Sequence, residues 1–406
     1  MPHEPQVRPA PRFAILNGMP SEVSTRGGVP PIGGHCDRRF APLRTALATN
    51  FREHGEVGTA LAVTLEGRLV VDLWAGWTDR ARTLPWRRDT LVDVFSVGKP
   101  MAALCLLMLV ERGRVDLDVP VATYWNEFAA AGKEGVTVRM LLAHRAGLPA
   151  IRPLLPPLSM YDWPLMTSAL AAEKPWWEPD SEHGYHVNTF GFLIGELVRR
   201  VSGETIGAFL QRAISGPLDA DFHFGVAARQ HRRVADFLFP EVTSEFLEPG
   251  TPLLLARAYM NPPGVSGLGT VNTQRWRAAE MPSTNAHATA RAVARIYSAL
   301  AAGGAVDGIR LLGAETVELA TCEASCGHDA VLNRPSRFGL GFQLSQPERP
   351  LGPNPRSFGH FGAGGSVGFA DPDQALAFAY TPNQGEGPRW QNPRNRGLMD
   401  ALYACL

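Results

Sequence analysis

Four residues near position 96 have the types and the spacing that nucleophilic catalysis requires. Ser96, Val97, Gly98 and Lys99 form an S-x-x-K tetrad. A serine hydroxyl is a weak nucleophile that needs a neighbouring base, and residues three apart lie on one face of a helix. Burial lowers the pKa of a lysine, so a buried Lys99 can accept a proton near neutral pH. We therefore predict Ser96 as the nucleophile and Lys99 as its activating partner.

The segment after the tetrad bears on the simpler alternative, a helix-capping serine followed by a solvated lysine. Residues 101–110 are all apolar, as in a buried helix. Pro100 places the start of that helix beside Ser96, because proline is tolerated only in the first turn. The chain contains only three lysines, Lys99, Lys133 and Lys174, and otherwise uses arginine. A lysine beside such an apolar run favours a functional role.

Hydrophobic patterning predicts strand-rich chain ends around a helical middle. Strands are expected at residues 59–65, 69–74, 339–344, 365–370 and 375–380. Helices are expected at residues 40–54, 96–111, 189–201, 206–214, 286–302 and 396–404. The simplest architecture is of the α/β (α+β) class: one antiparallel sheet built from both chain ends, flanked by helices, beside a mostly helical insert. A cleft between the two parts is the natural place for a site.

The domain organisation follows from the same pattern. Residues 1–36 are rich in Pro, Gly and Arg and are expected to form an irregular lead-in. Residues 37–406 are expected to form one hydrolase domain. Within it, about 37–115 and 330–406 would form a sheet subdomain and about 116–329 a helical subdomain.

Composition excludes several classes of function. Formal net charge is zero, so nothing favours nucleic acid or an anionic membrane surface as a partner. No segment resembles a signal peptide or reaches the length of a membrane span, which predicts a soluble cytoplasmic protein. Metal, nucleotide and cofactor motifs are absent, so we expect no cofactor and no metal. The expected partner is a small molecule, and a homo-oligomer is left open.

Two stretches resemble the serine β-lactamase and penicillin-binding superfamily. Residues 95–99 (FSVGK), followed by the apolar run, are similar to its first motif. Residues 141–149 (LLAHRAGLP) are similar to a stretch of its class C branch, which includes the family VIII carboxylesterases. The resemblance runs from about residue 35 to the C-terminus. It implies a β-lactamase-like fold and an acyl-enzyme on Ser96, with His144 in a structural role.

The second motif of the family, Y-x-N, has an imperfect counterpart. Tyr185 stands at the expected distance after Pro179, but Val187 occupies the asparagine position and Asn188 follows one residue later. In the lactamases that asparagine helps to bind the β-lactam amide. Its displacement therefore weighs against lactam turnover and is compatible with the esterase branch.

The resemblance implies that Tyr185 is the partner of Lys99. A phenolate beside an ammonium is stabilised by the opposite charge and can accept the Ser96 proton. His183 and His186 lie close in the sequence. A register shifted by one residue would give the proton-transfer role to His186 instead.

The third motif of the family, K-T-G, has a late counterpart in which His360 replaces the lysine and Gly362 is kept. Gly362 would let the strand pass close to the substrate. The resemblance implies that the backbone amides of Ser96 and Ala363 form an oxyanion hole. Trp390 resembles in position a tryptophan that lines the cleft in some relatives.

A competing motif lies a few residues further on. Residues 364–368 (GGSVG) match G-x-S-x-G, the nucleophile elbow of α/β-hydrolases. That fold needs an acid and then a histidine after the serine, and no histidine follows His360. We therefore expect Ser366 not to be the nucleophile.

These residues together predict a serine hydrolase that cleaves carboxylic esters through an acyl-Ser96 intermediate. A β-lactamase or a D-amino-acid peptidase would use the same three groups. An acyltransferase would differ only in the second nucleophile. A non-catalytic penicillin-binding-like scaffold would be expected to lack members of the triad, and all three are present here.

Overall fold

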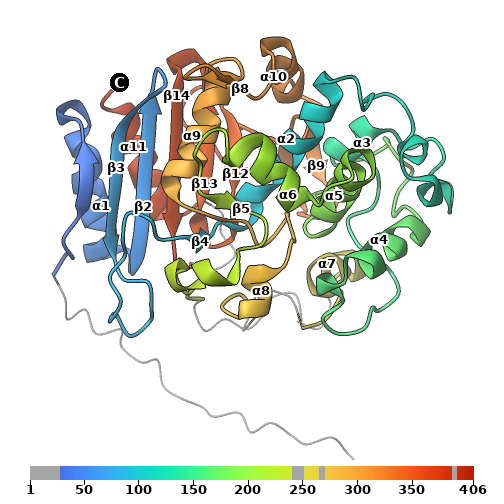
Figure 1. Ribbon diagram of the computed structural model, residues 1–406, viewed down its shortest axis with the longest axis horizontal. Helices are drawn as coiled ribbons and strands as arrows, with labels where there is room; N and C mark the ends of the chain where they lie inside the picture. Colours follow the sequence, from blue (N-terminus) through green and yellow to red (C-terminus); the bar gives the residue numbers. More distant parts are fainter. Residues whose placement is uncertain (1–27, 240–250, 265–269, 386–390) are drawn as a thin grey trace, which may run out of the picture.

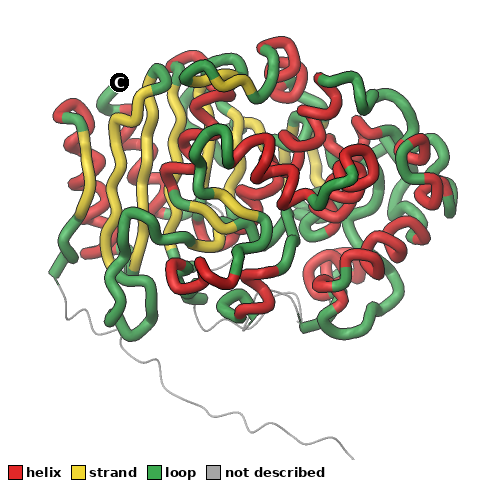
Figure 2. The backbone as a smooth tube through the Cα atoms, viewed as in Figure 1, coloured by secondary structure: helices red, strands yellow, loops and turns green. Residues whose placement is uncertain are grey.

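A long antiparallel sheet forms the left and central part of the molecule (Figures 1 and 2). The computed structural model describes residues 28–239, 251–264, 270–385 and 391–406. Within these residues the large sheet has nine strands, in the order β1-β3-β2-β14-β13-β12-β11-β10-β9. From that first edge to the last, the strands are β1 (Gly33–Cys36), β3 (Arg68–Gly76), β2 (Gly58–Leu65), β14 (Leu376–Pro382), β13 (Val367–Asp371), β12 (Phe358–Phe361), β11 (Gln343–Leu344), β10 (Arg334–Phe338) and β9 (Ser325–Asp329).

The two faces of this sheet differ in side-chain size. In β14, Leu376, Phe378 and Tyr380 belong to one core, and Ala377 and Ala379 belong to the other. Alternate residues of a strand point to opposite faces, so large side chains line one face and alanines line the other. The large side chains pack with α1 (Ala41–Glu53) and α11 (Pro393–Tyr403), and the alanines pack with α9 (Ala290–Ala301). The small residues let α9 lie close against the strands.

The other half of the molecule is helical, on the right in Figure 1. Its central helix is α2 (Gly98–Glu111), which packs against α5 (Thr189–Ser202) and α6 (Ile206–Leu210). The side chains of α2 are buried all round, from Gly98 to Leu109, as the apolar run predicts. The remaining helices are α3 (Val138–Leu142), α4 (Trp163–Ala172), α7 (Leu253–Met260), α8 (Gln274–Ala278) and α10 (Ala314–Thr321).

Two small sheets complete the fold. The described residues include a three-stranded sheet of β4 (Val92–Asp93), β6 (His287–Ala288) and β5 (Phe222–His223). They also include a hairpin of β7 (Ala305–Val306) and β8 (Ile309–Arg310). The three-stranded sheet matters for the site, because β4 leads directly into the segment that carries Ser96.

Several predicted elements differ from the observed ones. Residues 339–342 form a turn between β10 and β11 instead of a continuous strand, and Gly341 in this turn has a φ of +84°. A Cβ there would lie 2.2 Å from the Ala103 Cβ, so the turn closes directly on α2. The helix predicted at 286–302 begins at Ala290 because residues 287–288 pair as β6 and Thr289 caps the helix. After α6, residues 211–215 continue as a wider π-helical turn.

The lead-in predicted for residues 1–36 is not wholly irregular. Residues 33–36 form β1, the edge strand, and pair with β3. Gly33 and Gly34 lie against the Trp74 ring, where a Cβ would collide, so two residues of low strand propensity are selected by packing. Residues 1–27 lie outside the described part of the chain.

The predicted fold class is confirmed: an antiparallel sheet drawn from both chain ends is flanked by helices. The subdomain boundaries stay a prediction. Within the range assigned to the helical subdomain, α9 packs against β2, β13 and β14. None of the helices in the described residues is long and apolar enough to cross a bilayer.

Candidate active site

Ser96 lies in a short 3-10 turn, Phe95–Val97, at the point where β4 passes into α2. Phe95 has a φ of +49°, a strained conformation for a bulky residue. Its backbone N–H donates to the Asp93 carboxylate (2.8 Å), whose second oxygen accepts from the Trp276 indole (2.7 Å). This buried carboxylate holds the turn, and the Ser96 side chain stays half-buried at the N-terminal end of the helix. Burial raises the pKa of Asp93 well above its ordinary value.

Lys99 is fully buried, with 0% of its surface exposed. Its Nζ lies 3.0 Å from Ser96 Oγ and 3.0 Å from the Ser283 carbonyl oxygen. Burial lowers the pKa of Lys99 well below its ordinary value of 10.5, because a charged ammonium is disfavoured away from water. The structure thus contradicts the alternative of a capping serine with a solvated lysine, and it places an amine of reduced basicity against the serine hydroxyl.

The acceptor for Lys99, the carbonyl of Ser283, belongs to a loop that the sequence did not single out. Ser283 Oγ accepts from the Gly191 N–H at the start of α5 (2.6 Å). Asn285 ties the loop together: its Oδ1 accepts from the Met281 N–H (2.9 Å) and its Nδ2 donates to the Trp276 carbonyl (2.8 Å). The loop therefore links the lysine to α5 and to the tryptophan that supports Asp93.

Tyr185 is buried beside this pair, with its ring centroid 4.6 Å from Lys99 Nζ. Its backbone N–H donates to both oxygens of the Asp329 carboxylate, at 3.0 and 3.1 Å. Burial raises the pKa of Tyr185 well above 10, and a hydrogen bond with Ser96 opposes that shift. Burial thus favours a neutral amine, the state in which the sequence analysis expected Lys99 to act as a base, and a neutral phenol rather than the phenolate considered for Tyr185.

The neighbouring histidines His186 and His144 form hydrogen bonds with backbone groups. His186 Nε2 accepts from the Leu148 N–H (3.1 Å), and its Nδ1 faces the Gly184 carbonyl (2.6 Å) as donor. Burial lowers the pKa of His186 to about 4. His144 Nδ1 accepts from the His186 N–H (3.2 Å), in line with the structural role expected for His144.

His183 is also occupied, with its Nε2 2.9 Å from Ser336 Oγ, which donates in turn to Asp329 (2.7 Å). Asp329 further accepts from the N–H groups of Val331 and Leu332 (2.9 and 2.8 Å). This carboxylate therefore organises the turn that carries Tyr185. Sequence reasoning missed it, since no motif marks an aspartate whose partners are mostly backbone groups.

The displaced asparagine is engaged elsewhere. Asn188 Nδ2 donates to the Ala258 carbonyl on α7 (2.9 Å). Val187, at the position of the family asparagine, is buried in the core with 8% of its surface exposed. An apolar side chain therefore stands at the position that the sequence resemblance assigns to the family asparagine.

His360 lies on β12, with its ring centroid 5.8 Å from that of Tyr185. Burial, and next the nearby Lys99, lower the pKa of His360 to about 3, so it is neutral near pH 7. Gly362 follows at the end of the strand, where a Cβ would lie 2.1 Å from Ser366 Oγ. Ala363 begins a 3-10 turn and is half-buried. Of the third-motif residues, His360 thus lies beside Tyr185, and Gly362 lies against the segment that leads into Ser96.

Ser366 is fully buried, and its hydroxyl donates to the Val94 carbonyl (3.0 Å). A serine with no exposed surface is not placed to attack a substrate, so the structure supports the expectation that Ser366 is not the nucleophile. Trp390 lies outside the described residues.

Comparison with known proteins identifies the family. The model of the beta-lactamase family matches residues 42–402. The chain therefore belongs to the beta-lactamase family. The Esterase/beta-lactamase LipL of Mycobacterium tuberculosis is 36% identical over 361 residues, which are 86% of this chain and 82% of LipL.

Solved structures agree with this assignment. A family VIII carboxylesterase superposes with a TM-score of 0.86 at 38% identity, covering 93% of this chain and 100% of the other. A penicillin-binding protein homologue from Caulobacter crescentus gives a TM-score of 0.86 at 39% identity, again over 93% and 100% of the two chains. The predicted family and the assignment to the serine hydrolases are confirmed.

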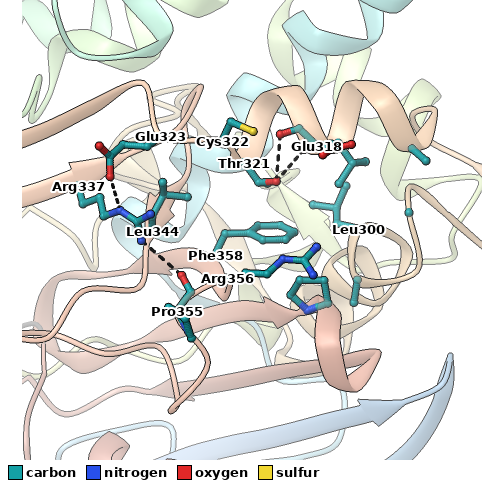
Figure 3. A pocket seen from close by; sticks show the side chains of 15 residues that line it. Leu300, Glu318, Thr321, Cys322, Glu323, Arg337, Leu344, Pro355, Arg356 and Phe358 are labelled. Carbon is teal, nitrogen blue, oxygen red and sulfur yellow. Dashed lines mark hydrogen bonds and ion pairs between the residues drawn. The ribbon is translucent and has the colours of Figure 1, made fainter.

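A separate cavity of about 540 Å³ lies away from these residues (Figure 3). Leu300, Glu318, Arg337 and Phe358 are among its lining residues, and Arg337 is paired with Glu323 there (2.7 Å). Its lining includes none of the predicted site residues.

Proposed function

We propose that the protein hydrolyses carboxylic esters of small molecules through an acyl-Ser96 intermediate. The observation that carries this proposal is the buried Lys99 amine, 3.0 Å from Ser96 Oγ. LipL is named an esterase/beta-lactamase, and a solved relative is a family VIII carboxylesterase, which supports ester substrates.

In the acylation step, Ser96 Oγ attacks the ester carbonyl carbon while its proton passes to the neutral Lys99 amine. A lowered lysine pKa supports this role, because an ordinary lysine is almost entirely protonated near pH 7. The carbonyl oxygen gains negative charge. The backbone N–H groups of Ser96 and Ala363 would hold it, the first of them at a helix N-terminus where N–H groups lack intrahelical partners.

Tyr185 would connect the base to the leaving group. Its phenol interacts with Ser96 and its ring lies against Lys99 Nζ, so it can pass a proton between the amine and the departing alcohol. As the ester C–O bond breaks, the alcohol leaves with that proton. In the second step water attacks the carbonyl carbon of acyl-Ser96 and gives up a proton to the same groups. The bond to Ser96 Oγ then breaks, Oγ takes that proton back, and the carboxylic acid is released.

Three residues favour esters over β-lactams. Val187 offers no amide to a lactam, and Asn188 is bonded to the backbone of α7. His360 is neutral where the lactamase motif carries a cation. We expect kcat/KM for esters to exceed that for cephalosporins by at least tenfold, a difference of about 1.4 kcal/mol in activation free energy.

The test combines labelling with turnover. A fluorophosphonate probe should modify Ser96 alone, located by peptide mapping, and the label should be lost in Ser96→Ala. A matched control is Ser215→Ala, which removes a buried hydroxyl that donates to the Phe222 carbonyl (2.9 Å) and contacts none of the predicted site residues in the hydrogen bonds it makes. It should label like the wild type. Turnover of p-nitrophenyl esters is then compared with turnover of nitrocefin.

The proposal is overturned if the label is found at another residue. It is also overturned if nitrocefin is hydrolysed efficiently while the esters are inert. Transfer of the acyl group to an added alcohol faster than to water would identify the acyltransferase alternative.

A further inference from the structure

The two amides of the proposed oxyanion hole come from distant parts of the chain. Ser96 precedes α2, and Ala363 follows β12. The chain between these two residues is too long to fix the distance between their amides. An oxyanion hole works only when both donors lie about 2.7–3.1 Å from the developing negative oxygen. Some contact must therefore hold the two segments in register.

Ser366 makes that contact with its side-chain hydroxyl and its backbone carbonyl. Its hydroxyl donates to the Val94 carbonyl, two residues before Ser96, at 3.0 Å. Its carbonyl accepts from the Gly362 N–H, one residue before Ala363, at 2.7 Å. A single buried serine thus joins the backbone on each side of the proposed hole.

The surrounding packing leaves the bridge little freedom. A Cβ at Gly362 would lie 2.1 Å from Ser366 Oγ and 2.3 Å from the Val94 carbonyl oxygen, so the two segments are in direct contact. From the other side, Asn395 Nδ2 on α11 donates to the Gly365 carbonyl (3.0 Å). The turn from 363 to 365 is therefore held at both its ends.

We propose that Ser366 is a positioning residue that sets the spacing of the two oxyanion-hole amides. The inference rests on the proposed function, since it assigns a task to that same site. It also explains why a G-x-S-x-G sequence occurs in a chain whose nucleophile lies elsewhere: the serine is selected for its hydroxyl bridge and the glycines for close approach. Without the hydroxyl, the Val94 carbonyl loses a donor, and the side-chain hydrogen bond that links the two segments is absent.

Ser366→Ala is the direct test, with Ser215→Ala as the control. Both serines are almost fully buried, and each donates to one backbone carbonyl. Complete loss of an oxyanion-hole donor costs about 10²–10³ in kcat. Misplacement of a donor should cost less, so we expect kcat of Ser366→Ala to fall by about 10- to 100-fold. KM should change by less than about threefold, because ground-state binding does not use the hole.

A second readout separates positioning from general damage. Phenylboronic acid forms a tetrahedral adduct with a catalytic serine and mimics the charged intermediate. Its affinity should fall in Ser366→Ala by the same factor as kcat, whereas the affinity for the product carboxylate should be unchanged. Ser215→Ala should keep wild-type values for all three quantities. Ser366→Cys, which retains a weak donor, should fall between the wild type and Ser366→Ala, and it decides the matter if the alanine variant does not fold.

The inference is overturned if Ser366→Ala keeps kcat and boronate affinity within twofold of the wild type. It is also overturned if Ser215→Ala loses as much, because the effect would then be general. A wild type that binds phenylboronic acid but hydrolyses no ester would overturn the proposed function alone, and the boronate ratio would still decide the role of Ser366. A wild type that does neither would overturn both.

Discussion

Tyr185 and His186 are adjacent in the chain, yet the structure gives them different tasks. Tyr185→Phe removes one hydroxyl from the proposed proton path and keeps the ring that stacks on Phe338. His186→Ala removes an imidazole whose two nitrogens bond the Leu148 N–H and the Gly184 carbonyl. We therefore predict that the first variant loses activity but stays stable, and that the second loses stability.

The magnitudes follow from these contacts. An unpaired buried polar group costs about 1–3 kcal/mol, and His186→Ala leaves two such groups, so the free energy of unfolding should fall by about 2–6 kcal/mol. Tyr185→Phe should lower kcat by about a thousandfold or more, since groups that act as one unit are lost together. That loss corresponds to about 4 kcal/mol in activation free energy. Its effect on the free energy of unfolding should be within about 1 kcal/mol.

The assay measures kcat with saturating p-nitrophenyl butyrate, at a temperature where circular dichroism shows both variants folded, and the midpoint of urea unfolding for each. His186→Ala should keep kcat within about tenfold of the wild type while its midpoint drops. The reasoning is refuted if Tyr185→Phe keeps most of its turnover while His186→Ala is folded and inactive. The proton-transfer role would then move to the histidine, one residue along.

Three further perturbations test the same framework. Lys99→Met should abolish turnover but raise the free energy of unfolding at pH 7. The pKa of Lys99 in the folded state lies below the ordinary 10.5, so the buried amine lowers the free energy of unfolding of the wild type at pH 7. The stability gained by Lys99→Met should therefore shrink as the pH approaches 10.5. Lys133→Met should lower the free energy of unfolding by about 2–4 kcal/mol with kcat unchanged, because the buried Nζ bonds three backbone carbonyls far from the site. Gly362→Ala should lower kcat at least tenfold, measured with the same ester, because the new methyl group must displace Ser366 or Val94.

The parts of the site that the sequence predicted well are local in the chain. Ser96 and Lys99 are three residues apart at the start of an apolar helix, and helix geometry alone brings them together. The sheet was predictable for a similar reason, since β2, β13 and β14 each carry an apolar, strand-like pattern. The turn at 339–342 was missed because its glycines serve contacts that are remote in sequence: Gly341 lies against α2, and Gly339 lies against the end of α10.

The supporting residues were missed because their contacts are long-range and largely involve the backbone. Ser283 reaches Lys99 across 184 positions through a carbonyl that any residue would supply. Asp329 reaches the Tyr185 N–H across 144 positions, and Asp93 is fixed by Trp276 across 183. No spacing rule connects such residues. A buried aspartate in a chain with zero net charge is indistinguishable in sequence from one at the surface.

The lowered pKa of Lys99 depends on how the fold buries its side chain. A nearby cation would lower the pKa of a lysine by like-charge repulsion. The histidines near Lys99 are not cations. The pKa of His186 is about 4 and that of His360 is about 3, so both imidazoles are neutral near pH 7. Burial is accordingly what lowers the pKa of Lys99. That burial comes from the packing of α2 between α5 and the strand that carries His360. Variants that admit water around Lys99 should therefore raise its pKa and move the acidic limb of the kcat/KM profile to higher pH, even where every catalytic group remains.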